Sequence, residues 1–105
     1  MQLPISKIDI KKKYKDLCKL DKVKKSLPKD SLFMVCNDIL TDSITSYKVM
    51  YKVQKSNKTK AKIKTLSDLK NQLNKNELTN IELYQIIEYG VKMYKSLRDN
   101  YGQFR

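Results

Sequence analysis

The chain has 105 residues and a formal net charge of +12, and 40% of its residues are apolar. This length and apolar content suit one folded domain over residues 1–105 and argue against a disordered chain. No apolar run approaches a membrane span, and the N-terminus lacks the apolar segment of a signal peptide, so we expect a cytoplasmic protein without membrane contact.

The first expected helix covers about residues 7–20. Ser6 can cap it, with Asp9 as the acidic partner of a capping box. The apolar residues that follow recur at helical spacing, and they are Ile10, Tyr14, Leu17 and Cys18. A break or short turn should then run to Leu27, because Pro28 cannot continue a helix but can begin one.

A second helix is predicted over residues 29–41, where a wide apolar face indicates deep burial. Beyond it, apolar and polar residues alternate with period two from Tyr47, a turn-like segment follows at 56–59, and alternation resumes. We therefore predict a two-stranded β-hairpin at residues 46–65. The alternative continues the second helix through a set that also has helical spacing, namely Ile44, Tyr47, Met50 and Tyr51.

Leucines at 66, 69 and 73 define a short third helix, ended by residues 74–76. Thr79 and Glu82 form a capping box that begins the fourth helix, which should run to about Asn100 with Gly102 as its stop. The fold class is thus α+β and helix-dominated, with about four helices and one β-hairpin; the alternative is all-α. The expected core comprises Leu17, Leu32, Cys36, Ile39, Leu69, Leu83, Ile86, Ile87 and Leu97.

Residues that support catalysis or metal binding are scarce. The chain has no histidine, which is the commonest general base and metal ligand near neutral pH. Its two cysteines, Cys18 and Cys36, are far apart, and Gly90 and Gly102 form no phosphate-binding loop. We therefore expect a non-enzymatic protein with no catalytic residue, metal or cofactor.

The basic residues favour a polyanionic partner. Between Asp42 and Asp68 there is no acidic residue, and seven lysines occur there: Lys48, Lys52, Lys55, Lys58, Lys60, Lys62 and Lys64. A basic hairpin can lie along a phosphate backbone, and the expected first helix adds Lys11, Lys12 and Lys13. The sequence therefore predicts an accessory or regulatory protein that binds nucleic acid, most simply DNA. A solvated lysine face is the ordinary alternative.

The C-terminal helix carries more apolar surface than a small core needs. A heptad-like series runs through Leu83, Ile87, Gly90, Tyr94, Leu97 and Tyr101, with Ile86, Tyr89 and Met93 beside it. Because tyrosine is frequent at binding hot spots, the interface residues we expect are Tyr89, Met93, Tyr94 and Tyr101. They predict a homodimer, or a phage or mobile-element module that inhibits or redirects another protein.

Overall fold

The computed structural model describes residues 7–103, and it describes side chains from Asp9 to Asp99. The elements in chain order are α1 (Lys7–Val23), a 3₁₀ turn (Lys24–Ser26), α2 (Lys29–Val53), α3 (Asn57–Asn74) and α4 (Asn80–Gln103). In this range there is no strand, so the protein is all-α. The predicted cap at Ser6 lies outside the described residues.

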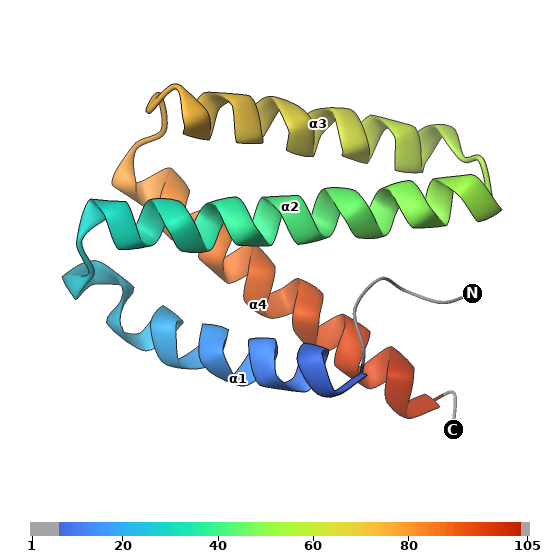
Figure 1. The fold of residues 1–105 in the computed structure, drawn as a ribbon, viewed down its shortest axis with the longest axis horizontal. Coiled ribbons are helices and arrows are strands. Elements are labelled where there is room, and N and C mark those ends of the chain that lie inside the picture. Colours follow the sequence, from blue (N-terminus) through green and yellow to red (C-terminus); the bar gives the residue numbers. More distant parts are fainter. Residues whose placement is uncertain (1–6, 104–105) are drawn as a thin grey trace.

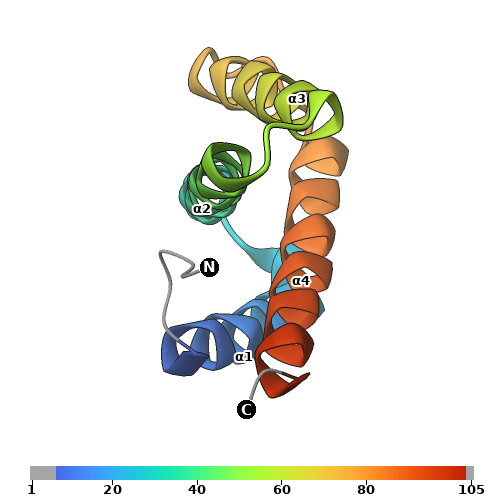
Figure 2. The same ribbon diagram turned by 90° about the vertical axis from the view of Figure 1, so that its right-hand side faces the viewer.

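The four helices form two layers. α3, α2 and α1 lie one beside the next, with α2 in the middle, and α4 crosses behind them (Figure 1). Seen from the side, α4 runs along one flank of the other three (Figure 2). α3 packs against α2, whereas α4 packs against both α1 and α2. The molecule measures 38 × 28 × 16 Å, and its thin dimension reflects the two layers.

The predicted β-hairpin at residues 46–65 is wrong. Residues 46–53 belong to α2, residues 57–65 belong to α3, and the connection at residues 54–56 joins two helices. A half-exposed strand would need its alternate apolar residues on one face, yet Val53 is 68% exposed while Tyr47 is half-buried. The helical alternative was correct.

Two buried serines explain why α2 was predicted too short. Ser43 and Ser46 occupy positions that face the core, where an apolar residue would have extended the helical pattern. Serine also has low helix propensity because its hydroxyl competes for the backbone. Here the Ser43 hydroxyl donates to the carbonyl oxygen of Ile39 at 2.8 Å, within the same helix.

Three other helix boundaries follow local signals, whereas the predicted stop at Gly102 is wrong, because α4 continues through it to Gln103. Pro28 stands at the N-cap of α2, as predicted, and a 3₁₀ turn precedes it. α3 ends where expected: Asn76 adopts a positive φ of 59°, and the Glu77 N–H donates to the Gln72 carbonyl oxygen at 3.0 Å, as in a Schellman motif. At α4, the Thr79 N–H donates to Glu82 Oε1 at 3.0 Å, which confirms the capping box.

The core lies where α1, α2 and α4 meet and extends between α2 and α3. Seven of the nine predicted core residues are buried; Leu69 and Leu97 are half-buried at its edge. The buried core also includes residues that were not on that list, among them Ile10, Leu40, Leu66, Leu73, Leu78 and Tyr94. One side of Leu69 is left uncovered because α3 and α4 diverge beside it.

Candidate functional site

The seven lysines between Asp42 and Asp68 lie on the α2–α3 hairpin, which here means the antiparallel helices α2 and α3 and their connection (Figure 1). All seven are exposed: Lys48, Lys52, Lys55, Lys58, Lys60, Lys62 and Lys64. Within residues 9–99, none of the seven is in an ion pair, whereas Lys13 and Lys24 are. The seven lysines therefore lie on one helical hairpin, and their charges are not neutralised by ion pairs within residues 9–99. They lie on helices and not on strands.

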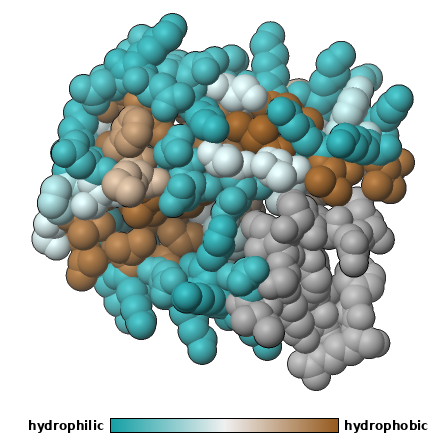
Figure 3. Space-filling model, in the orientation of Figure 1, coloured by the Kyte–Doolittle hydropathy of each residue, from teal (hydrophilic) through white to brown (hydrophobic). Residues whose placement is uncertain are grey.

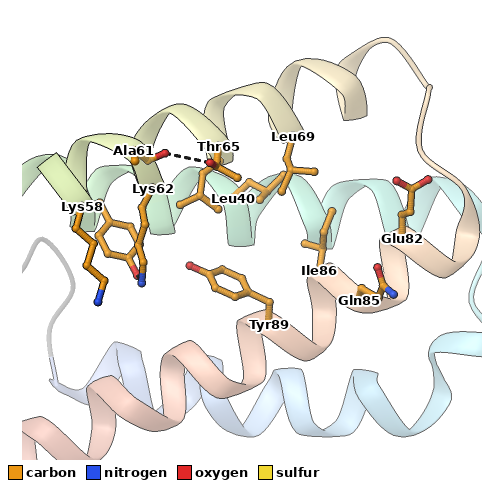
Figure 4. Close-up of a pocket in the computed structure, with 12 residues that line it drawn as sticks. Leu40, Lys58, Ala61, Lys62, Thr65, Leu69, Glu82, Gln85, Ile86 and Tyr89 are labelled. Atoms are coloured by element: carbon orange, nitrogen blue, oxygen red, sulfur yellow. Dashed lines mark hydrogen bonds between the residues drawn. The ribbon is translucent and has the colours of Figure 1, made fainter.

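Helical geometry divides the lysines of α3 into two pairs. Lys60 and Lys64 are four residues apart and share an outward face. Lys58 and Lys62 share another face and line a cleft beside α4 (Figure 4). The Lys62 ammonium lies 5.4 Å from the centre of the Tyr47 ring, a cation–π distance. The two pairs can thus serve different ligands.

The three lysines predicted to bind nucleic acid from the first helix differ in exposure and in their contacts. Lys11 and Lys12 are exposed, but Lys13 pairs with Asp42 at 2.5 Å and lies 5.9 Å from the centre of the Tyr94 ring. The start of α1 and the α2–α3 connection lie at the same end of the molecule, on opposite edges (Figure 2). Hydrophilic residues accordingly gather over α3 and again over α1, with apolar residues between them (Figure 3).

The predicted interface residues of α4 do not share one surface. Tyr94 is buried, and its hydroxyl donates to Asp42, so it belongs to the core. Met93 is half-buried, and its sulfur lies 2.7 Å from the hydroxyl oxygen of Ser43. Tyr89 is half-buried in the cleft, whereas the side chain of Tyr101 lies outside the described residues. Most of the heptad series therefore packs inward.

A cleft of about 530 Å³ separates α3 from α4. Its middle is apolar, with Leu40, Leu66, Leu69 and Ile86, and Tyr47 and Tyr89 also line it. Figure 4 shows Lys58 and Lys62 at one end and Glu82 and Gln85 at the other. The cleft opens to solvent, because Lys58, Ala61, Lys62, Thr65 and Gln85 are all exposed.

The two ends of the cleft differ in charge. At one end, the Thr79 N–H and hydroxyl donate to Glu82, and the backbone hydrogen bond in particular lowers the pKa of this carboxyl group. The opposite end carries the two lysines. Burial raises the pKa of the Tyr89 phenol, so Tyr89 is a neutral hydroxyl between the charged ends.

Sequence patterns did not predict this cleft. They indicated the apolar residues Ile86 and Tyr89 beside the heptad series and, separately, the lysines of residues 42–68. What places them together is the divergence of α3 from α4, which is a tertiary arrangement without a local signal. With the correct helical assignment of residues 57–65, the pattern Lys58, Ala61, Lys62, Thr65, Leu69 would have indicated one face of a helix.

No group of three or more His, Cys, Asp or Glu side chains gathers as a metal site among the described residues. In the same part of the chain, no helix has both the length and the apolar character needed to cross a membrane. Over residues 7–103 the structure is all-α, with four α-helices, a basic helical hairpin and an apolar cleft. Comparison with protein-family models, curated proteins and solved structures finds no match.

Proposed function

We propose that this chain is a small, non-enzymatic protein that binds nucleic acid, most simply duplex DNA, through the α2–α3 hairpin, in an accessory or regulatory role. The observation that carries the proposal is the set of seven exposed lysines between Asp42 and Asp68, none of which is in an ion pair within residues 9–99. Such unneutralised cations release counterions from a phosphate backbone when they bind it.

The kind of contact follows from the residue type. Lysine is a point charge without the planar donor fork of arginine, so it suits phosphates better than base edges. Lys48 and Lys52 on α2, and Lys60 and Lys64 on α3, are spaced by one helical turn and can meet successive phosphates. Binding should therefore depend weakly on DNA sequence and strongly on salt concentration.

A cytoplasmic location forms part of this proposal. Cys18 and Cys36 are free, and such unpaired thiols are typical of a reducing compartment. A second candidate function, a protein-binding module of a phage or mobile element, is favoured by the apolar cleft beside Tyr89. That surface is separate from the outward pair Lys60 and Lys64, so the two functions can be tested separately.

The experiment measures the anisotropy of a labelled random DNA duplex between about 50 and 200 mM salt. The variant Lys60→Gln/Lys64→Gln should bind about tenfold more weakly at low salt, and its log–log salt slope should fall by about two units. The matched control, Lys92→Gln/Lys95→Gln, removes the same charge from exposed sites on α4 and should bind nearly as the parent does.

Equal losses in the two variants would mean that only net charge matters and would contradict an interface on the hairpin. Absence of salt-dependent binding by the parent protein would overturn the proposal as a whole. A further variant, Lys11→Gln/Lys12→Gln, measures how much α1 contributes to DNA binding. If it weakens binding as much as Lys60→Gln/Lys64→Gln does, the interface includes both basic edges of the molecule.

A further inference from the structure

The cleft between α3 and α4 leaves apolar side chains at the edge of the core partly uncovered. α3 packs mainly against α2, while α4 crosses α2 and leans toward α1, so α3 and α4 diverge (Figure 2). Leu69 and Tyr89 remain half-buried at the walls, and Ala61 and Thr65 are exposed beside them. The cleft volume of about 530 Å³ falls within the range of about 300–1,000 Å³ seen for ligand sites.

The cleft has the length of a short helix. Its α3 wall runs from Lys58 to Leu69, and at a rise of 1.5 Å per residue this span is about 16 Å, or three helical turns. A helix of that length presents apolar side chains at positions i, i+3, i+4 and i+7 along one face. Leu66, Leu69 and Ile86 form the apolar surface that such side chains would cover.

The charges give the cleft a direction. Lys58 and Lys62 lie where α3 begins, and Glu82 lies at the opposite end, where α4 begins (Figure 4). A helix carries partial positive charge at its N-terminus and partial negative charge at its C-terminus. An occupant would therefore place its N-terminus near Glu82 and its C-terminus near the lysines, running parallel to α4 and antiparallel to α3.

We propose that the cleft between α3 and α4 is a docking groove for an amphipathic helix of a partner protein that carries acidic residues beside its apolar face. The apolar floor of Leu66, Leu69 and Ile86 receives the apolar face, and Lys58 and Lys62 pair with the acidic residues near its C-terminus. This proposal goes beyond nucleic-acid binding and does not depend on it, because the apolar side chains of Leu66, Leu69 and Ile86 cannot donate hydrogen bonds to phosphate.

Other occupants fit the cleft less well. A small apolar molecule would stay largely uncovered, because five lining residues on α3 and α4 are exposed to solvent, whereas typical sites bury most of their ligand. A second copy of this chain would bring together two proteins of net charge +12. A nucleic-acid backbone is charged and polar, so it would not cover the apolar floor. Charge and shape together favour an acidic amphipathic helix.

The test uses the full-length protein and two synthetic helical peptides of about 14 residues. Both have leucines at i, i+3, i+4 and i+7; one has glutamates beside this apolar face near its C-terminus, and the other has lysines at the same positions. We expect the acidic peptide to bind at least about tenfold more tightly than the basic one in a calorimetric titration. No binding of the acidic peptide, or equal binding of both, would overturn the proposal.

A substitution that fills the groove shows where the peptide binds. Ala61→Trp places a large side chain in the cleft from an exposed position and should abolish binding of the acidic peptide while leaving duplex DNA binding unchanged. Asn71→Trp adds the same side chain to an exposed outward site of α3 and is the matched control. Equal peptide binding by both variants would overturn the proposal. Thermal unfolding of each variant verifies that it is folded.

Charge reversal tests the role of the two lysines. The variant Lys58→Glu/Lys62→Glu should lose the preference for the acidic peptide and bind the basic peptide more tightly than the parent protein does. If the variant still prefers the acidic peptide, Lys58 and Lys62 do not recognise the acidic residues, and the proposed charge pairing is wrong. Sedimentation of the free protein adds one more outcome: self-association abolished by Ala61→Trp would make a second copy the occupant and refute a foreign helix.

Discussion

The hydroxyl of Tyr94 donates a hydrogen bond to the carboxylate of Asp42, which joins the middle of α4 to α2. The same carboxylate accepts a hydrogen bond from the Lys13 ammonium at 2.5 Å, so α1 is tied to this point as well. Burial raises the pKa of the Tyr94 phenol, with Asp42 acting in the same direction, so the hydroxyl stays protonated as a donor.

Tyr94→Phe should destabilise the protein by about 1.5–3 kcal/mol, because a buried hydrogen bond to a charged acceptor is lost while the ring remains. Urea unfolding followed by circular dichroism measures the change. Tyr84→Phe is the control: Tyr84 is half-buried on the same helix, and its hydroxyl has no hydrogen-bond partner among residues 9–99. Equal changes in the two variants would contradict the role of the Asp42 contact.

Gly90→Ala should be destabilising by about 1 kcal/mol, even though alanine is the better helix former by a similar amount. A Cβ at Gly90 would lie 2.7 Å from Ile39 Cδ1 and 2.9 Å from Cγ1, and Ile39 is itself buried, so it cannot move aside freely. In an Ile39→Ala background, the same glycine substitution should be neutral or stabilising. Additive effects in this double-mutant cycle would disprove the close contact.

The capping box of α4 should make stability depend on pH below neutrality. Hydrogen bonds from Thr79 lower the pKa of Glu82 from 4.5, so folding is favoured by its ionised form. This contribution is therefore present above pH 4.5 and is lost as the pH falls through the lower pKa of the folded state. Glu82→Gln should flatten this part of the stability profile, measured by urea unfolding at several pH values.

A companion substitution tests the other half of the capping box. Thr79→Ala removes the hydroxyl that accepts a hydrogen bond from the Glu82 N–H at 3.2 Å, and it should cost about 1 kcal/mol. Thr45→Ala replaces the same residue type at an exposed position in the middle of α2, away from any helix start. An equal loss there would attribute the effect to threonine removal in general and not to capping.

The two cysteines should differ in reactivity. Cys36 is buried, its thiol donates to the Leu83 carbonyl oxygen at 3.2 Å, and burial raises its pKa to about 12. Since the thiolate is the reactive form, Cys36 should be inert at pH 8 in the folded protein. A Cys18→Ser variant should therefore react with an aromatic disulfide reagent only after unfolding in urea. Rapid reaction of the folded variant would contradict the burial of Cys36.

Local signals in the sequence predicted the parts of the fold that local interactions determine. The capping box at Thr79 and the start of α2 at Pro28 were correct because each depends on residues within one helical turn. The prediction was wrong for residues 43–65. Serines occupy positions on the buried face of α2 where apolar residues are usual, so period-two spacing was the stronger pattern in the sequence. Tertiary packing stabilises the helical conformation of these residues.

The candidate site was predictable in composition but not in shape. The cationic character of residues 48–64 is a property of the sequence and survives the change from strands to helices. The burial of Tyr94 and the pairing of Lys13 depend on Asp42, a residue 29 positions from Lys13 and 52 positions from Tyr94. The spacing of apolar residues within a helix does not predict contacts between residues so far apart in the sequence. The cleft also depends on such long-range contacts.

The placement of α1 has a consequence for how the protein is made. α1 packs mainly against α4, although α2 follows it directly in the chain. During synthesis, the apolar face with Ile10 and Leu17 therefore lacks its main cover until α4 has left the ribosome. The α2–α3 hairpin closes over a short connection and can form earlier. α1 is thus translated before α2 and α3 but reaches its final packing only once α4 is available.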